Sequence, residues 1–390
     1  MLGTVACMRN VSTRSPKTKV CVIGAGAFGG WSALHLLRKG ASVTLLDSWG
    51  PANVRASSHD ETRVIRSIYG PKDIYVKMVA EAFQQWKENE KRWRTKLYQR
   101  TGVLWMVGED DSFERSALPI VKNYGFQVQE LSLSDARQKY SQINFEEVKH
   151  VFYEEEAGYL LAKNNCQTVV KKFVEEGGEY RQASVKPGKI KAKTMEYLTL
   201  SDGSQVSADF YVFACGPWLG SLFPTVIGNR VSPSRQEVFY FEVPPNGTRF
   251  YENAMPIWAD HGTRFMYGIP ASKDRGFKVA DDTHGPSFDP NTEDRTVSPK
   301  GLKEAQQFLA YRFPALKGAR LVNSHVCQYE NSPDGDYIID QHPEAENVWI
   351  VGGGSGHGFK MGPAIGRYIS DLVLGVEKPN PVFSLARFKT

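Results

Sequence analysis

Residues 19–29 read KVCVIGAGAFG, and this stretch decides the fold. Its first five residues are mostly β-branched and predict a short strand, while residues 31–39 have the apolar spacing of a helix. The glycine turn between them would bind the pyrophosphate of a dinucleotide at the helix N-terminus. Gly24 allows the tight turn, Gly26 lets the backbone approach the phosphates, and Gly29 permits close packing of helix and strand.

A second strand, predicted over residues 41–46, leads into Asp47, which lies 18 residues beyond Gly29. An acidic residue at about 20 residues from the glycine turn is placed to meet the ribose of the adenosine. Strand, helix and strand together form a βαβ unit. Because glycine clusters also make ordinary turns, it is this context that favours dinucleotide binding over a purely structural turn.

The glycine spacing fits FAD and NAD equally well, but a second glycine-rich turn lies at residues 352–358. Strand-forming residues 348–351 precede this turn, and a helix with Ile365 and Ile369 on one side follows it. A nicotinamide site would not need the second turn. A helix N-terminus there could stabilise negative charge on the pyrimidine edge of a reduced flavin, so we expect FAD as the cofactor.

Composition limits the class of protein. The chain has 390 residues, of which 41% are hydrophobic, which suits two domains of roughly 100–200 residues each. Its net charge of +5 comes from 48 basic and 43 acidic residues spread along the chain, and we expect no nucleic-acid partner. No charge-free apolar run of about 18 residues occurs, so we expect no membrane association. The five cysteines form no CxxC pair, which favours a reducing compartment and predicts no metal site.

The two termini bear on the location of the protein. Residues 1–19 contain basic residues, Ser and Thr but no acid; we expect residues 1–17 to form a disordered tail, with an organellar transit peptide as the alternative. The C-terminal residues 388–390, Phe-Lys-Thr, lack the Ser-Lys-Leu type of peroxisomal signal. We therefore expect a cytoplasmic protein, and a peroxisomal location is the alternative.

The rest of the chain predicts an α/β fold with two domains. The pattern predicts helices over residues 72–97, 131–140 and 164–177, and strands over residues 101–107 and 206–214. Residues 215–218, CGPW, follow as a further turn suited to a nucleotide edge, and residues 233–266 are typical of a β-rich substrate domain. The expected FAD-binding domain comprises residues 18–99, 151–228 and 322–390, and the substrate domain residues 100–150 and 229–321.

Five stretches resemble one family of flavoenzymes. They are GAGAFG (24–29), SSHDETRVIR (57–66), RFMYGIP (264–270), CQYENSPDGDYIIDQHP (327–343) and GSGHGFKMGPAIG (354–366). On these motifs the chain resembles the monomeric sarcosine oxidase family, which includes pipecolate, N-methyltryptophan and fructosyl-amino-acid oxidases. The resemblance runs from about residue 18 to residue 375. It implies a two-domain, Rossmann-like FAD-binding fold with a β-rich substrate domain.

The resemblance also implies roles for single residues. Cys327 corresponds to the cysteine that attaches the flavin covalently as a thioether; an inert buried cysteine is the alternative. Arg66 and Lys360 correspond to the pair that clamps the substrate carboxylate, because an amino acid must be held with its C–H bond toward flavin N5. For these two residues the alternative is a pair of surface cations in ion pairs.

Further implied roles concern oxygen and the flavin ring. Lys278, 11 residues after Tyr267, corresponds to the lysine that helps reduced flavin react with oxygen; a solvent-exposed loop lysine is the alternative. Tyr267 would lie near the substrate. Arg63 would lie against the flavin and favour its anionic reduced state, and for His357 we expect a structural role rather than that of a general base. The expected cofactor-binding residues are Gly24, Gly26, Gly29, Asp47, Ser58, Thr62, Arg63, Val185, Cys327, Gly354, Gly356, His357, Gly358 and Lys360.

One position departs from the family pattern. Sarcosine oxidases carry a histidine four residues after the oxygen lysine, whereas this chain has Asp282 there. His284 would replace that histidine only if the loop shifts. An acid at this place would repel a carboxylate and attract a cationic amine, which argues against sarcosine itself as the substrate.

These observations predict an FAD-dependent oxidase that acts on the C–N bond of an amino acid. We expect the amine to be N-substituted or cyclic, the products to be an imine and hydrogen peroxide, and the partners to be this substrate and molecular oxygen. We expect a monomer. The alternatives are an amine dehydrogenase that passes electrons to a carrier, a fructosyl-amino-acid oxidase, and a non-catalytic flavin-binding protein, which would not need Arg66 and Lys360.

Overall fold

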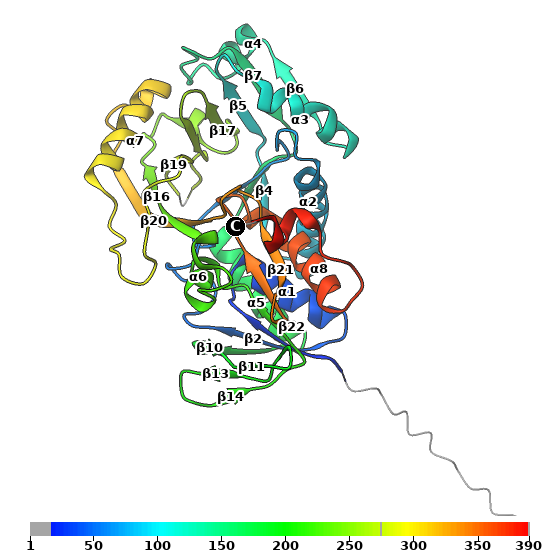
Figure 1. The fold of residues 1–390 in the computed structure, drawn as a ribbon. Coiled ribbons are helices and arrows are strands. Elements are labelled where there is room, and N and C mark those ends of the chain that lie inside the picture. The colour runs from blue at the N-terminus through cyan, green and yellow to red at the C-terminus, as the bar shows by residue number, and fades with distance from the viewer. Residues whose placement is uncertain (1–16, 274, 389–390) are drawn as a thin grey trace, which may run out of the picture.

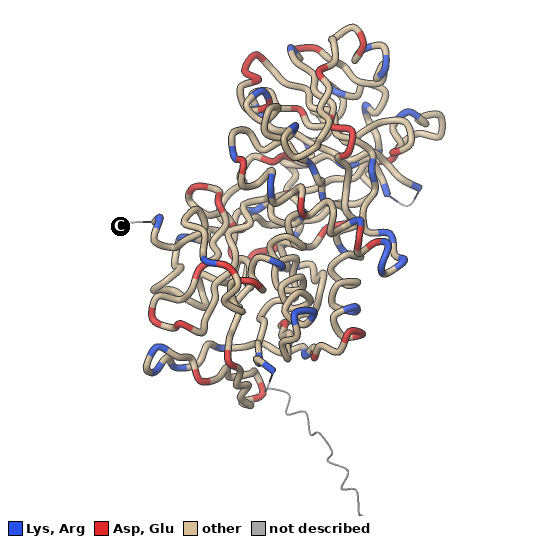
Figure 2. Tube along the Cα trace, turned by 90° about the vertical axis from the view of Figure 1, so that its right-hand side faces the viewer, with Lys and Arg blue, Asp and Glu red and all other residues tan. Residues whose placement is uncertain are grey.

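The computed structural model of the protein describes residues 17–273 and 275–388. Two large sheets organise this part of the chain, with helices packed against each (Figure 1). The predicted N-terminal tail lies outside the described residues except for Lys17. None of the described helices is both long and apolar enough to cross a membrane. Figure 2 shows basic and acidic residues interspersed along the described chain.

The first sheet carries the βαβ unit. Its strands are β1 (Lys19–Ile23), β2 (Ser42–Asp47), β9 (Glu179–Gln182), β15 (Phe210–Phe213), β21 (Ile338–His342) and β22 (Ala345–Gly352). The strand order is β21-β22-β15-β1-β2-β9. All neighbouring pairs are parallel except β21 and β22, which are antiparallel. In this order only β15 separates β22, from the end of the chain, from β1. Because β1, β15 and β22 are parallel, the two predicted glycine turns lie at the same end of these strands, their carboxyl ends.

Each face of the first sheet packs against a different layer. Because side chains alternate along a strand, Val20 and Val22 of β1 join the core formed with the long helices, whereas Cys21 and Ile23 join a second core. The helices of the first layer are α1 (Ala27–Arg38), α2 (Asp73–Trp93), α5 (Ala162–Glu175) and α8 (Gly362–Val373). The second layer contains β10 (Val185–Pro187), β11 (Ile190–Lys191), β12 (Thr194–Met195), β13 (Leu198–Leu200), β14 (Gln205–Val206) and α6 (Leu219–Leu222).

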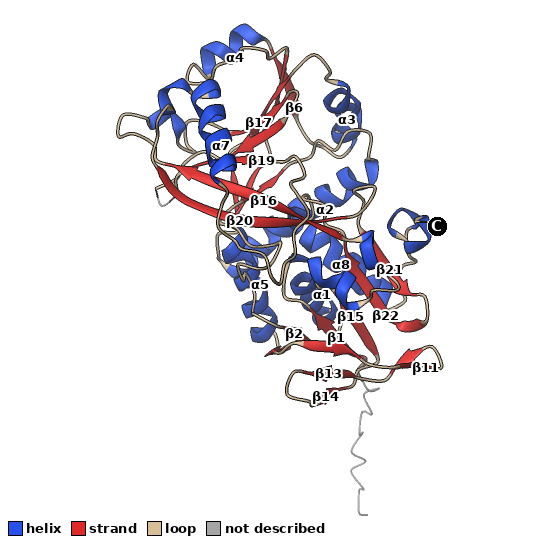
Figure 3. Ribbon diagram, turned by 60° about the vertical axis from the view of Figure 1, so that its left-hand side comes forward, coloured by secondary structure: helices blue, strands red, loops and turns tan. Residues whose placement is uncertain are grey.

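The second sheet forms the β-rich part of the molecule (Figure 3). In sheet order its strands are β20 (Leu321–Asn331), β16 (Ser232–Phe241), β19 (Phe277–Asp281), β18 (Phe265–Gly268), β17 (Ile257–His261), β5 (Val103–Val107), β7 (His150–Glu154) and β6 (Val128–Leu131). The helices beside it are α3 (Ser112–Asn123), α4 (Leu133–Lys139) and α7 (Pro299–Arg312). A small sheet of β3 (Arg63–Ile65), β8 (Gly158–Leu160) and β4 (Tyr98–Arg100) completes the described strands.

Strand alternation in the second sheet separates its core from its site-facing side. Phe277 and Val279 of β19 pack in the core that contains residues of α7. Lys278, between them, points to the opposite face, where its partner on β16 is Tyr240. On the same face Tyr267 of β18 pairs with Ala280. This face carries Lys278 and Tyr267, two of the candidate site residues.

Most predicted elements are present with shifted ends. Helix α1 begins at Ala27 rather than at Trp31, because the glycine turn itself forms the first helical turn. The helix predicted over 131–140 begins at Leu133, because the Ser132 hydroxyl caps it by accepting a hydrogen bond from Asp135 N at 3.1 Å. The single strand predicted over 206–214 was wrong in extent, since β14 and β15 are separate strands.

In the structure, the segments predicted for the two domains share the second sheet. Strand β7 pairs with β5, and β20 pairs with β16, so both strands belong to the second sheet. Most of their residues nevertheless fall in the segments 151–228 and 322–390, which were predicted for the FAD-binding domain. Strand β19, which carries Lys278, lies beyond residues 233–266, the stretch whose pattern predicted the β-rich part. The division into two domains remains a prediction, and the shared strands explain why its boundaries are difficult to place from sequence.

Candidate active site

The first glycine turn has no room for side chains. A Cβ atom at Gly24, whose φ is +103°, would lie 2.2 Å from the carbonyl oxygen of Ala214. A Cβ at Gly26 would lie 2.8 Å from Ser58 Oγ, which accepts a hydrogen bond from Ala27 N at 3.0 Å. A Cβ at the third glycine, position 29, would lie 1.8 Å from the oxygen of the first. The turn therefore keeps its backbone open to a ligand.

Asp47 fixes the loops at the ends of β1 and β2. Its Oδ2 accepts the Ala25 N–H at 2.7 Å, and its Oδ1 accepts the N–H groups of Trp49 and Gly50 at 2.9 and 2.7 Å. The carboxylate also lines the cavity described next. Its predicted contact with a ribose remains a prediction, and the three backbone bonds give it a structural role as well.

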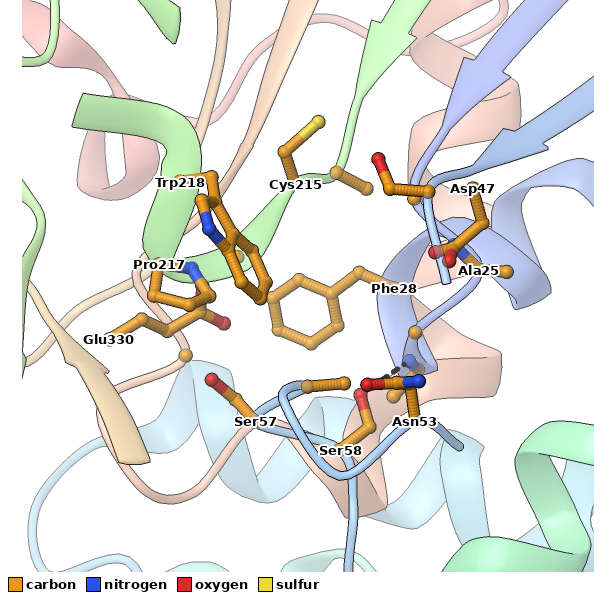
Figure 4. A pocket seen from close by; sticks show the side chains of 18 of the residues that line it. Ala25, Phe28, Asp47, Asn53, Ser57, Ser58, Cys215, Pro217, Trp218 and Glu330 are labelled. Atoms are coloured by element: carbon orange, nitrogen blue, oxygen red, sulfur yellow. Dashed lines mark hydrogen bonds between the residues drawn. The ribbon is translucent and has the colours of Figure 1, made fainter. Parts of the chain in front are cut away.

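A cavity of about 390 Å³ runs between the two glycine turns (Figure 4). The residues predicted to bind the cofactor that line it are Gly24, Gly26, Asp47, Ser58, Arg63, Val185, Gly354, Gly356 and Gly358. Gly26 is the N-cap of α1 and makes no side-chain cap; the Ala27 N–H of the first turn is taken by Ser58 Oγ, which leaves the N–H groups after it for a phosphate. The cradle of glycines and the open helix N-terminus fit the pyrophosphate of a dinucleotide.

Five of the predicted cofactor residues do not line this cavity. His357 and Lys360 line a second cavity instead, of about 300 Å³, and Gly29 packs behind the glycine turn. Thr62 and Cys327 are buried beside Arg63. The residues common to both cavities are Arg63, Tyr329, Gly356 and Phe359. A ligand in the first cavity therefore meets a ligand in the second at this junction.

Arg66 and Lys360 both line the second cavity. Lys360 Nζ donates to Tyr69 Oη at 2.9 Å and to the carbonyl oxygen of His357 at 2.8 Å. The Arg66 guanidinium donates to the Ile68 carbonyl and lies 4.7 Å from the centre of the Tyr69 ring. Within residues 17–273 and 275–388 neither cation makes an ion pair, so the alternative of two surface ion pairs does not describe them.

Burial acts strongly on Lys360. Burial lowers the pKa of its amine, and the nearby Arg66 charge lowers it further, so that it lies well below its usual range. An anion bound between these two side chains would oppose both effects. The second cavity is therefore built to gain stability from a bound carboxylate.

His357 has both ring nitrogens engaged. Nε2 lies 3.0 Å from the carbonyl oxygen of Gly335 and so must donate, which leaves Nδ1 to accept from the Tyr337 hydroxyl at 2.9 Å. Burial, and then the charge of Lys360, lowers its pKa to about 3. A neutral ring with two fixed hydrogen bonds supports the structural role expected for this residue rather than that of a general base.

A buried group of charges lies behind the junction. Arg63 Nη2 is 2.8 Å from Cys327 Sγ, and its Nη1 is 2.9 Å from Asp60 Oδ2. Lys278 Nζ is 2.7 Å from the same Asp60 oxygen and 3.0 Å from the Thr62 carbonyl oxygen. The Lys278 side chain is only 1% exposed and lines neither cavity, which contradicts the alternative of an exposed loop lysine.

Asp60 is the centre of this group, and sequence reasoning missed it. Besides Arg63 and Lys278, it accepts from Tyr240 Oη at 2.7 Å, and His325 Nε2 lies 3.1 Å away. Burial alone would raise the pKa of its carboxyl, but the charges of Lys278 and Arg63 hold that pKa well below its usual range. The available signal was its place in the SSHDETRVIR motif, three residues before Arg63.

Asp282 lies in the second cavity, as its place in the family pattern suggests. Its Oδ1 accepts a hydrogen bond from Tyr329 Oη at 2.6 Å. His284 lines the same cavity, and so does Tyr267, whose hydroxyl has a pKa raised by burial. The cavity thus presents one carboxylate together with the cations Arg66 and Lys360.

Comparisons with known proteins agree with this geometry. A monomeric sarcosine oxidase from Arthrobacter sp. (strain TE1826) is 27% identical over 388 residues, covering 94% of this chain and 96% of the relative. An N-methyl-L-tryptophan oxidase from Yersinia pestis (strain Pestoides F) is 28% identical over 376 residues, covering 94% and 98%. The solved L-proline dehydrogenase from P.horikoshii has a TM-score of 0.82 at 19% identity, covering 95% of this chain and 98% of that one, which shows a common fold.

The family described as FAD dependent oxidoreductase matches residues 19–372, from β1 into α8. This range contains both glycine turns and every residue that lines the junction of the two cavities. The dinucleotide expected from the sequence is therefore FAD. The chain belongs to the family of FAD-dependent oxidoreductases.

Proposed function

We propose that the protein oxidises the C–N bond of an amino acid whose amine is N-substituted or part of a ring. One observation carries this proposal: Arg66 and Lys360, without an ion pair in the described chain, line a cavity that meets the FAD cavity. The names of two relatives, a sarcosine oxidase and an N-methyl-L-tryptophan oxidase, support a substrate that is an N-methyl amino acid.

The side chains would hold the substrate at both of its charges. Arg66 and Lys360 bind the carboxylate, and the Asp282 carboxylate attracts the cationic amine, so a zwitterion matches the cavity. Trp105 and Phe265 give the cavity aromatic walls, which favour a side chain larger than that of sarcosine. Holding both ends fixes the C–H bond at the junction, where the flavin ring would lie.

Bound FAD would supply the two-electron oxidation of the amine to an imine, which water hydrolyses, and the transfer of those electrons to oxygen, which gives hydrogen peroxide. The glycine turns would hold its phosphate linker, and Arg63, which lines both cavities, would stabilise negative charge on the ring. We further propose a thioether from Cys327 to the flavin. Support comes from its Sγ atom, which lies 2.8 Å from the guanidinium of Arg63, a residue that lines both cavities.

The proposed oxygen lysine is held by a carboxylate. Lys278 is bound to Asp60 at 2.7 Å and lines neither cavity, so part of its charge is compensated. This observation favours, as a second candidate, a dehydrogenase that passes electrons to a carrier and reacts slowly with oxygen. Hydrogen peroxide formed per substrate oxidised under air, in the presence of an artificial electron carrier, separates the two: a ratio near one identifies the oxidase and a ratio near zero the dehydrogenase.

The substrate proposal is tested by anaerobic mixing of the flavoprotein with pairs of compounds. Each pair contains an N-alkyl or cyclic amino acid and the same amine without its carboxylate. We expect loss of the oxidised flavin spectrum with the amino acid and not with the amine. Equal bleaching by both members would show that the cations do not select the substrate. The cavity cation Lys72, whose charge Asp336 already pairs at 2.6 Å, provides a control as Lys72→Met.

We propose that the protein acts as a monomer in the cytoplasm. The name of the Arthrobacter relative, a monomeric sarcosine oxidase, supports the first part. Both cavities are lined by residues of the single described chain. Light scattering of the purified flavoprotein and fluorescence microscopy of the tagged full chain test the two parts separately.

A further inference from the structure

Glu330 is a buried carboxyl group that points into the FAD cavity. It lies on β20, its residue is 9% exposed, and Figure 4 shows it on the side opposite Asp47. The neighbouring turns carry glycine where a side chain would cover it. A Cβ at Gly354 would lie 2.8 Å from Glu330 Oε1, and a Cβ at Gly216 would lie 3.2 Å from Oε2. These glycines leave the carboxyl accessible to whatever fills the cavity.

One oxygen of the Glu330 carboxyl lacks a hydrogen-bond partner among the described residues. Oε2 has no hydrogen bond to any of the described residues, and Glu330 takes part in no ion pair within residues 17–273 and 275–388. A buried polar group without a hydrogen bond costs about 1–3 kcal/mol, so such groups are rarely left unmatched. The missing partner is therefore expected on the ligand.

We propose that Glu330 is a cofactor-binding residue that, as a neutral carboxylic acid, donates its O–H to the sugar–phosphate linker of FAD. Its two carboxyl oxygens lie beside the Gly216 turn and the Gly354 turn, both of which line the cavity. An ionised carboxylate at this place would repel the pyrophosphate, whereas the acid offers it a donor. The proposal rests on membership of the FAD family and not on the identity of the amine.

The surroundings favour the neutral acid. Burial raises the pKa of Glu330 to about 7, and only the backbone of Gly354 opposes this. The other ionisable residues lining the cavity are Asp47, Arg63, Cys215 and Tyr329.

Each of these four groups is accounted for. Burial raises the pKa of the Cys215 thiol and that of Tyr329, so both stay neutral near pH 7. Asp47 accepts three backbone N–H bonds, and Arg63 is paired with Asp60. Glu330 is thus the group in this lining whose charge changes near neutral pH.

The test measures FAD binding and uses no amine. Full-length protein carrying Cys327→Ser keeps its flavin exchangeable, and FAD is titrated by flavin fluorescence between pH 6 and 8. With a pKa near 7, ionisation of Glu330 should weaken FAD binding about tenfold over this range. Glu330→Gln, a neutral isostere, should bind with a flat profile. The exposed Glu346→Gln is the matched control and should keep the slope.

A second measurement needs no substitution at Glu330. If the free site is mostly ionised at pH 7.5 and the bound site is neutral, FAD binding takes up about 0.8 proton. Calorimetry in two buffers of different ionisation enthalpy gives this number. Zero uptake, proton release, or parallel pH profiles with and without the Glu330→Gln substitution would overturn the proposal. Failure here leaves the proposed amine oxidation untouched, because neither readout involves catalysis.

Discussion

Replacing Asp60 with Asn removes the one charge that compensates two buried cations. Asp60 is fully buried and contacts Lys278, Arg63, Tyr240 and His325 at 2.7–3.1 Å. Asn keeps the size and one acceptor oxygen but not the charge. Lys278 would lose its ion pair and keep the hydrogen bond to the Thr62 carbonyl oxygen at 3.0 Å.

The loss in stability follows from this burial. Breaking a buried ion pair by removing one partner costs about 3–5 kcal/mol, because the remaining charge is left without compensation. Lys278 limits part of the loss, since burial already lowers its pKa and it can deprotonate. Arg63 cannot deprotonate, so the part of the stability loss that comes from its unpaired charge remains. We expect Asp60→Asn to lower the free energy of unfolding by about 3 kcal/mol or more.

Urea unfolding of the full-length flavoprotein measures the loss. The control is Glu242→Gln, which breaks the exposed pair with Arg320 and should cost less than about 1 kcal/mol. Asp60→Asn combined with Lys278→Met should recover only the part of the loss that comes from Lys278, because Arg63 keeps its charge without a carboxylate partner. If Asp60→Asn costs no more than Glu242→Gln, the reasoning from buried charge is refuted.

The depressed pKa of Asp60 also predicts how the stability difference between the natural chain and Asp60→Asn depends on pH. The folded-state pKa of Asp60 is depressed, so its contribution to stability is fully present above the unfolded pKa of about 4. That contribution is lost as the pH falls through the lower folded pKa. The stability difference between the natural chain and Asp60→Asn should therefore be constant near neutral pH and shrink on acidification below about pH 4. A difference that grew with acid would contradict the assigned charges.

Three further predictions concern catalysis. Cys327→Ser should release its flavin on acid precipitation, whereas the natural chain should retain it in the protein pellet; flavin retained by the variant would exclude the thioether. Arg66→Ala and Lys360→Ala should each weaken the apparent affinity for carboxylate substrates by about 10- to 100-fold, as measured by anaerobic flavin reduction at varied substrate concentration. The control Lys72→Met should leave this affinity unchanged. Lys278→Met should slow reoxidation of the reduced flavin by oxygen by about 100-fold in stopped flow, and an unchanged rate would assign the oxygen reaction elsewhere.

Local patterns in the sequence were enough to predict the FAD-binding part of the fold. The glycine turn needs Gly24, Gly26 and Gly29 because atoms only 1.8–2.8 Å away exclude a Cβ, and this requirement leaves a local sequence pattern. The second turn at residues 352–358 left a similar pattern, and its strand β22 lies in the same sheet. Element ends were less predictable, since α1 starts within the turn itself.

The residues that sequence reasoning missed depend on packing between distant segments. Asp60 matters because β16, β19 and β20 bring Tyr240, Lys278 and His325 to it, and no local pattern encodes that meeting. Glu330 matters because turns at positions 216 and 354 leave its carboxyl uncovered. Both acids lie inside motifs in which the sequence indicated roles for other residues, Arg63 and Cys327. The motifs alone do not show that these two acids are buried.

The contrast between two pairs of cations supports the substrate site that we propose at Arg66 and Lys360. Arg63 and Lys278 share Asp60, so their charge is already compensated within the protein. Arg66 and Lys360 share no carboxylate in the described chain, and the pKa of Lys360 is held low by burial and by Arg66. A carboxylate ligand would relieve that repulsion, while an amine lacking the carboxylate would leave both charges unpaired. Selection of amino acids over simple amines therefore follows from the pair that the fold leaves uncompensated.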